Sequence, residues 1–379
     1  TYLDYAKKMF STLADKVVQY GKNLTCFEVY PNGTTIYEEI IPYDVAHILA
    51  ITIMALGDIT YNSTMIDIGK SIIDSWWQFA SPIPPWEINA TSGQPNVDYC
   101  YILLGDEAEV AFDAVPRVSE DTRNYLLSFL EREAELLLKY FWDDSTSLFV
   151  FSVYQNGTVR DNTYYVYTAE LAKNLVSLYL WTRNETYLTY ALDFYKSFKE
   201  HFLTPHGVYT ALNPDLTVKD NKCATIWMLS QYRTLLVELW SATGNETYLQ
   251  EANHIYELAK QHRDKCFVLT YNADTGALID RRWAIGGLKE VAIEPITKLF
   301  RFAGNVLFPY TGSFGRVPLA LFNMSSTSWS ITKVEVEAGD PAVIQIVPYS
   351  ADAQRIVSLY VNGTFLPAFY GDRCILPGE

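Results

Sequence analysis

Residues 184–202, NETYLTYALDFYKSFKEHF, and residues 245–262, NETYLQEANHIYELAKQH, repeat one pattern that decides the fold. In both stretches, apolar and aromatic residues recur at steps of three and four, which is the spacing of one buried stripe along an α-helix. Polar residues fill the remaining positions, so each stretch predicts a helix with one face on a core and the other in solvent. Stretches of the same kind predict further helices at residues 2–20, 63–78 and 120–141.

A second, more apolar helix follows each amphipathic one. Because the second helices are the less polar partners, we expect them to lie inside, with the amphipathic helices around them. They are predicted at residues 43–56, 98–112, 161–181, 220–240 and 286–304. The chain is thus an internal repeat of roughly 60 residues, with units at about 1–61, 62–118, 119–184, 185–245 and 246–305.

Hairpin-like segments join the two helices of most units. Alternating apolar and polar residues flank a turn in each segment, and in three of the four the turn is Asn-Gly or Asp-x-Gly, where Asn and Gly tolerate positive φ. These segments lie at residues 25–40, 147–162, 207–221 and 266–283. The second unit has SPIPPWEINATSGQPN at 81–96 instead, and its prolines predict an irregular loop without strands.

Helix pairs in series, with inner helices packed on each other, predict a mainly α fold, either an α/α toroid or a solenoid. Over about residues 1–305 the pattern resembles the α/α-toroid superfamily, the six-hairpin glycosidase-like proteins and sugar epimerases. TGNETYLQEANHIYELAK at 243–260 is similar to the outer-helix signature of that superfamily. The resemblance is to the repeat pattern and to no single family. Five units instead of six imply a five-membered ring, an open ring, or one completed by another segment.

The last part of the chain has a different character. Residues 325–372 are rich in β-branched residues that alternate with polar ones, and Gly-Asp, Pro and Asn-Gly interrupt them. This predicts four or five strands of a small β-sheet or sandwich module at 319–379, joined through a linker at 308–318. Packing against the helical part is one role for this module, and carbohydrate binding or self-assembly is another.

Composition excludes some classes of function. The formal net charge of −15 and the isoelectric point near 4.8 argue against nucleic acid as a partner. No apolar run approaches the roughly 18 residues of a transmembrane helix. No phosphate loop, metal-ligand cluster or Ser-His-Asp grouping is recognisable, and no cofactor is implied. The chain opens on Thr1 without an initiator Met, which suits a mature, processed protein or a fragment of one.

Acceptor motifs for N-linked sugar are unusually dense. Nine of the 18 asparagines are followed by x-Ser/Thr, where roughly two or three would be expected from residue frequencies. Turns and helix caps explain the positions of these motifs but not their number, so we expect an extracellular or cell-surface glycoprotein. The motifs begin at Asn23, Asn32, Asn62, Asn89, Asn156, Asn184, Asn245, Asn323 and Asn362.

The five cysteines suit an oxidising compartment. None forms a Cys-x-x-Cys motif, and the spacing does not fit zinc, so one or two disulfides with a leftover thiol are expected. In adjacent units one cysteine enters a hairpin and another opens an inner helix. The repeat therefore predicts the pairs Cys223–Cys266 and Cys26–Cys100, with Cys374 free.

The starts of the inner helices are where ligand cavities of α/α toroids open, and aromatic residues beside carboxylates gather there. Such residues suit sugars, which stack on rings and need hydrogen-bond partners. Aromatic residues recurring on helices are also ordinary core residues. The candidate substrate-binding residues are His47, Tyr99, Tyr164, Tyr167, Trp227, Arg282 and Trp283.

Carboxylates are the candidate catalytic groups, because the superfamily resemblance implies a glycosidase with one protonated and one ionised carboxyl group. The candidates are Glu170, Glu290, Asp161 and Asp106. Asp161, like Asp44, Asp98 and Asp220, also suits a helix N-cap. Glu170 is predicted about two turns inside its helix, where capping does not account for it, although Arg233 or Lys289 would be sufficient ion-pair partners.

Two functions remain open from the sequence. The first is a carbohydrate-active enzyme of the glycoside hydrolase type. The second is a non-catalytic glycoprotein of a surface layer or extracellular assembly. His47 is the only histidine predicted on an inner helix, whereas the sugar 2-epimerases of the superfamily depend on inner-facing histidines, so a histidine-based isomerase is not expected.

Overall fold

The computed structural model describes residues 40–89, 92–115, 118–261, 263–264 and 267–283. It also describes short strands at residues 28–29 and 35–36 and between residues 305 and 375. The predicted helices at 2–20 and 286–304 lie outside the described residues, and Glu290 lies there with them.

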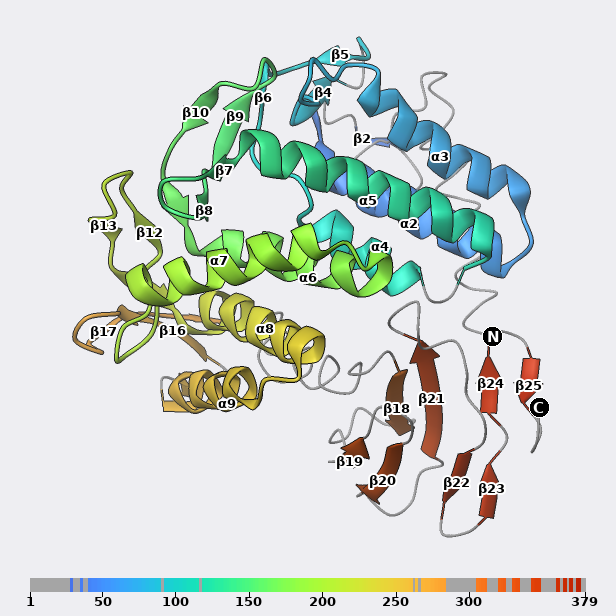
Figure 1. Cartoon of the computed structure of the whole chain (residues 1–379). Helices are drawn as coiled ribbons and strands as arrows, with labels where there is room; N and C mark the ends of the chain where they lie inside the picture. Colours follow the sequence, from blue (N-terminus) through green and yellow to red (C-terminus); the bar gives the residue numbers. More distant parts are fainter. Residues whose placement is uncertain are drawn as a thin grey trace.

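Inner and outer helices alternate along the chain, as the repeat predicts (Figure 1). The inner helices pack in series, α2 on α4 and α6 on α8, while α3, α7 and α9 pack on the inner helices that precede them. None of these helices is long and apolar enough to cross a lipid bilayer. The inner helices are α2 (Tyr43–Ile59), α4 (Asp106–Ala114), α6 (Ala169–Thr182) and α8 (Thr225–Thr243), and the outer ones are α3 (Ser63–Trp77), α5 (Glu120–Tyr140), α7 (Glu185–His201) and α9 (Glu246–Gln261).

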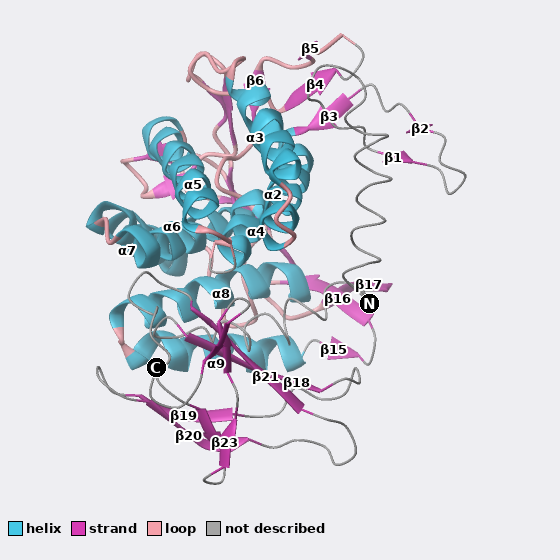
Figure 2. Cartoon of the chain, turned by 90° about the vertical axis from the view of Figure 1, so that its right-hand side faces the viewer, coloured by secondary structure: helices cyan, strands magenta, loops and turns pink. Residues whose placement is uncertain are grey.

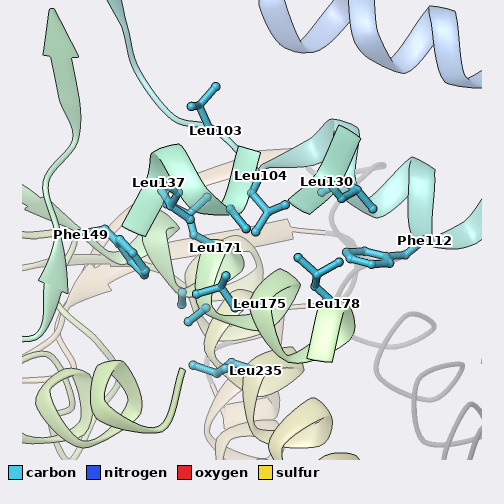
Figure 3. Close-up of a cluster of buried hydrophobic side chains, with 14 of the residues drawn as sticks. Leu103, Leu104, Phe112, Leu130, Leu137, Phe149, Leu171, Leu175, Leu178 and Leu235 are labelled. Atoms are coloured by element: carbon cyan, nitrogen blue, oxygen red, sulfur yellow. The ribbon is translucent and has the colours of Figure 1, made fainter. Parts of the chain in front are cut away.

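The burial of the helices matches their patterns. Nearly every residue of α6 is buried, whereas α7 buries only one stripe. Figure 3 shows the resulting core, in which leucines of α5, α6 and α8 meet with no exposed surface. On α6 these leucines follow one face at steps of four and three, and fully burying such a side chain contributes about 1.5–3 kcal/mol. The set includes Leu130, Leu171, Leu175, Leu178 and Leu235.

Asparagine side chains start several outer helices. The Oδ1 atom of Asn184 accepts a hydrogen bond from the Thr186 amide at 3.1 Å, and Asn245 does the same for Thr247 at 3.0 Å. These bonds satisfy amides that otherwise lack a partner in the first helical turn. The residues that begin these outer helices are therefore also the asparagines of glycosylation motifs.

Small antiparallel sheets lie where the inner helices begin, and Figure 2 shows β3–β6 gathered at one end of α2 and α3. In each sheet, the strand before an inner helix pairs with strands from the following unit. The sheets are β3 (Ile40–Pro42) with β4 (Glu87–Asn89) and β5 (Gln94–Pro95); β6 (Tyr99–Cys100) with β9 (Ser152–Tyr154) and β10 (Val159–Asp161); β11 (Tyr164–Tyr165) with β12 (Ala211–Leu212) and β13 (Val218–Asp220); and β14 (Lys222–Ala224) with β16 (Phe267–Asn272), β15 (Arg263–Asp264) and β17 (Leu278–Trp283).

All four predicted hairpins are present, including β1 (Glu28–Val29) with β2 (Thr35–Ile36). A further short pair joins β7 (Trp142–Asp143) to β8 (Leu148–Phe149). The prediction for residues 81–96 was wrong, because β4 and β5 form a short ladder there. The ladder begins only after Pro85 and ends at Pro95, so the prolines limit its length without preventing it.

Three inner helices begin later than predicted. Asp98, Asp161 and Asp220 precede the strands β6, β11 and β14, and the helices follow these strands. Asp161 Oδ1 accepts from the Thr163 amide at 2.9 Å, and Asp220 Oδ1 accepts from the Lys222 amide at 3.0 Å. These aspartates therefore close tight turns instead of capping helices.

The C-terminal strands form antiparallel pairs, drawn in Figure 1 as a group apart from the helices. The predicted linker is corrected in part, because residues 308–311 belong to β18, which pairs with β21 along its whole length. The pairs are β18 (Asn305–Thr311) with β21 (Ala342–Pro348), β19 (Ala320–Met324) with β20 (Trp329–Val334), β22 (Leu359–Val361) with β23 (Thr364–Leu366), and β24 (Ala368–Tyr370) with β25 (Arg373–Ile375).

The structure does not show the predicted disulfides, since Cys100 and Cys223 are buried free thiols. Their expected partners, Cys26 for Cys100 and Cys266 for Cys223, lie outside the described residues.

Candidate functional site

Carboxylates occupy the first turns of three successive inner helices. Asp44 lies on α2, Glu107 and Glu109 on α4, and Glu170 on α6. Helix N-termini favour negative charge, because their unpaired amides carry partial positive charge. Burial raises the pKa of Asp44, and the nearby Asp106 raises it further. Glu170 therefore lies at the helix start and not two turns inside, as the sequence had suggested.

A single lysine joins two of these carboxylates. Lys173 Nζ contacts Glu109 Oε1 and lies 3.8 Å from Glu170 Oε1. Gln231 of α8 donates a hydrogen bond to Glu170 Oε2 at 3.1 Å. The Lys173 side chain is 1% exposed, that of Glu170 is 9% exposed and that of Glu109 is 30% exposed. The two carboxylates thus converge on one buried ammonium, and Glu109 is the more accessible of the two.

A second acidic pair is fully buried between α2, α4 and α5. Tyr43 donates a hydrogen bond to Glu133 Oε1 at 2.5 Å, and the Gly105 amide donates to Glu107 Oε1 at 2.7 Å. Burial raises the pKa of Glu107 to about 7, with smaller contributions from Asp44 and Asp106. Burial raises the pKa of Glu133 well above its ordinary value, and Glu107 adds to this.

The loop that carries Glu107 is held from α6. Asn174 Nδ2 donates to the carbonyl oxygens of Leu104 at 2.8 Å and Gly105 at 3.0 Å. Leu104 has φ of +63°, in the left-handed region that leucine rarely adopts. The two bonds from Asn174 stabilise this turn, so α6 orients the first turn of α4 and its carboxylates.

The buried pair predicts that the protein is more stable in acid than at neutral pH. The pKa of Glu107 is higher in the folded protein than in the unfolded chain. Its contribution to stability is therefore fully present below the unfolded pKa of about 4.5 and is lost as the pH rises through about 7. For Glu107 the loss is about 3 kcal/mol. Urea unfolding at pH 4.5 and pH 8 measures it. The variant Glu107→Gln should show a smaller difference, and an identical pH dependence in the variant and the wild type would contradict the assignment.

Aromatic rings form a continuous row across the same end of the inner helices. The ring centroids of Tyr101 and Phe151 are 5.1 Å apart, and those of Phe151 and Tyr165 are 4.5 Å apart. Trp86 is anchored at one end, where its carbonyl accepts from the Tyr43 amide at 2.7 Å. All the rings are half-buried, so each keeps an exposed part. We call this row the aromatic stripe; it consists of Trp86, Tyr99, Tyr101, Phe151, Tyr165 and Tyr167.

Two predicted substrate-binding residues, Tyr99 and Tyr167, belong to the aromatic stripe. Tyr164 does not, because it is 1% exposed and donates to Asp143 Oδ2 at 2.6 Å. His47 is fully buried and stacks on Tyr43, and burial lowers its pKa to about 3, so it is a neutral core residue. Neither buried side chain is therefore placed to bind a substrate.

The remaining predicted residues are dispersed. Asp106 is exposed on the first turn of α4. Asp161 closes the turn before β11, where it accepts from the Thr163 amide. Trp227 lies on α8, and Arg282 and Trp283 lie on β17, but their side chains are outside the described part of the structure.

The sequence did not predict the two residues that hold Glu170, Lys173 through its ammonium and Gln231 through its side-chain amide. Lys173 follows Glu170 by three residues, a spacing that permits contact on one helix face and was visible in the sequence. Gln231 comes from another helix, and no sequence signal indicated it. Of the two expected partners, Arg233 donates to the carbonyl of Ala252 at 3.1 Å, and Lys289 lies outside the described residues.

The arrangement of inner and outer helices is that of an α/α toroid, which carbohydrate-active enzymes of known structure share. The alpha-1,2-mannosidase from Trichoderma reesei matches with a TM-score of 0.57 at 11% identity, over 76% of this chain and 67% of its own. The cellobiose 2-epimerase from Bacillus thermoamylovorans matches with 0.56 at 11% identity, over 73% and 77%. A family 76 glycoside hydrolase from a bovine Bacteroides thetaiotaomicron strain matches with 0.51 at 16% identity, over 76% and 63%.

No protein-family model and no curated protein sequence matches the chain. The structural likeness thus defines the class of fold, an α/α toroid. At identities this low it defines the fold alone, and the chemistry has to be argued from the residues of this chain.

Proposed function

We propose that this protein is a glycoside hydrolase in which Glu109 and Glu170 are the acid/base carboxylates. The observation that carries the proposal is their convergence on Lys173 at the helix ends crossed by the aromatic stripe. Glycoside hydrolysis requires two carboxyl groups flanking the scissile bond, one of them ionised. An adjacent ammonium favours the ionised form of one carboxylate, and a sugar seated on the stripe would reach the more exposed Glu109 first.

The aromatic stripe supplies the second requirement, a surface for sugar rings. The C–H faces of sugars pack on aromatic rings, while their hydroxyl groups bond to polar groups at the edges. Tyr165 and Tyr167 directly precede α6, which carries Glu170 in its first turn. A substrate on these rings would therefore place a glycosidic bond near the carboxylates.

We also propose that the protein is extracellular or on the cell surface and carries N-linked sugar. The density of acceptor motifs supports this, and the described Asn62, Asn156, Asn184 and Asn245 are exposed. Helix capping uses the side-chain oxygen, whereas a glycan attaches through the nitrogen, so one asparagine can serve both purposes. We expect glycopeptides at these four positions in protein purified from its natural source, and unmodified peptides at all four, detected by mass spectrometry, would contradict the proposal.

The alternative is a non-catalytic glycoprotein of a surface layer or extracellular assembly, with self-association through the C-terminal β module. One observation favours it. Lys173 is almost completely buried and Glu170 nearly so, as in an ion pair that only holds helices together.

A screen of purified protein against polysaccharides and oligosaccharides separates the two functions. The panel includes alpha-1,2-linked manno-oligosaccharides and cellobiose, taken from the names of the enzymes with this fold, and release of reducing ends is measured. Hydrolysis of at least one glycan supports the enzyme. Absence of both turnover and binding across the panel would contradict the proposed hydrolase and favour the non-catalytic glycoprotein.

A further inference from the structure

Two cations are positioned on the aromatic stripe. The guanidinium carbon of Arg160 lies 3.8 Å from the centroid of the Tyr99 ring and 5.7 Å from that of Tyr101. Lys219 Nζ lies 5.9 Å from the centroid of the Tyr165 ring and donates a hydrogen bond to Thr163 Oγ1 at 2.7 Å. Contact with ring faces holds such cations in place without neutralising them.

These two cations have no carboxylate partner among the described residues. In this respect they differ from Lys173, Lys196 and Lys199, which all contact carboxylates in a chain of net charge −15. The polar contact of Arg160 is a long one, 3.4 Å from Nη1 to Ser152 Oγ. Both side chains are exposed, so their positive charge is available to a ligand on the stripe.

The carboxylates nearby are held by other donors. Asp161 accepts from the Thr163 amide at 2.9 Å, Asp220 from the Lys222 amide at 3.0 Å, and Glu87 from Asn96 Nδ2 at 2.8 Å. Each forms a local turn or loop contact, and none of these bonds involves Arg160 or Lys219. The two cations therefore remain as uncompensated donors along the rings.

We propose that the aromatic stripe binds an acidic glycan, with Arg160 and Lys219 each binding an oxyanion of a pyranose whose C–H face stacks on the neighbouring rings. This inference rests on the proposed carbohydrate-active function and specifies its substrate class. A carboxylate, sulfate or phosphate substituent would supply the same chemistry, since the fork of Arg160 donates to two oxygens at once. Two separate cations in an otherwise acidic protein fit isolated anionic substituents on a glycan better than the dense charge of a nucleic acid.

The test compares matched ligands that differ only in charge. Oligogalacturonate is compared with its fully methyl-esterified form, and a sulfated galactan oligosaccharide with its desulfated form, by calorimetry and by intrinsic tryptophan fluorescence. We expect the charged member of at least one pair to bind about tenfold or more tightly, since hydrogen bonds to charged groups contribute more than neutral ones. This preference should weaken as salt is raised. The pair that shows the preference identifies the substituent.

Variants assign the preference to residues. Arg160→Gln and Lys219→Gln should each reduce the charged-to-neutral affinity ratio severalfold, because each variant weakens binding of the charged ligand more than that of the neutral one. Arg183→Gln is the matched control, because Arg183 lies 5.7 Å over the Tyr179 ring at the opposite end of α6, and it should change neither affinity. Equal affinities within both pairs would overturn the inference but leave the proposed function intact. Absence of binding to any glycan would overturn both.

Discussion

Replacing Glu170 with glutamine is expected to lower the rate of glycoside hydrolysis about 10²–10⁴-fold, the range for loss of a general acid or base. Glutamine has nearly the same shape, so Gln231 still has an oxygen to bond, but the side chain no longer donates or accepts a proton. Glu109→Gln should give a loss of the same order, because both carboxyl groups act on one bond. Steady-state kinetics on a glycan identified by the screen measures both effects.

Glu251→Gln is the matched control for this experiment. Glu251 is also a poorly exposed glutamate on a helix, where it accepts from Lys199 at 2.5 Å and from Tyr195 at 2.9 Å. It belongs to the outer layer on α9, so its change should lower stability without changing the rate per folded molecule. Full activity in both Glu170→Gln and Glu109→Gln would remove this pair from the reaction even if the protein proved to be a hydrolase.

Replacing Lys173 with methionine is expected to lower the free energy of unfolding by about 3–5 kcal/mol, the range for breaking a buried ion pair from one side. Methionine fills a similar volume, but Glu109 and Glu170 would then share a poorly solvated space without a cation. Because protonation relieves their repulsion, the loss should be smaller at pH 4.5 than at pH 8. Urea unfolding at both pH values tests the expectation.

The comparison for this variant is Lys196→Met. Lys196 makes an ion pair with Asp193 at 2.8 Å, but its side chain is 70% exposed. Exposed pairs contribute about 0–1 kcal/mol, so this substitution should change stability little at either pH. Equal losses in the two variants would show that Lys173 does not hold the two carboxylates.

The helix pairs were predictable because their signal is local. The steps of three and four in residues 184–202 and 245–262 describe a buried face directly, and both stretches are outer helices in the structure. The starts of three inner helices were not predictable, because a stretch such as Tyr164–Tyr167 suits a strand as well as a helix. Pairing with β12 of the next unit decides the outcome, and sequence periodicity contains no information on that pairing.

The site was predictable only in part, because contacts between different helices and units leave no local signal in the sequence. The sequence singled out Glu170, Tyr99 and Tyr167, since carboxylates and aromatic residues gather near helix starts. It did not show that Glu109 approaches Lys173, because the two lie on different helices. Nor did it distinguish the buried Tyr164 from the half-buried Tyr165, although successive side chains of a strand point to opposite faces.

The pairing of each inner-helix strand with the following unit limits how this protein can be divided. An excised helix pair would keep an unpaired strand edge at its site-bearing end, and such edges promote association with other chains. The smallest autonomous piece should therefore exceed one helix pair. In engineering terms, exchange of a single unit between related toroids has to include the hairpin of the next one, so a cut between a hairpin and the inner-helix strand that follows it is a better junction than a cut at a repeat boundary.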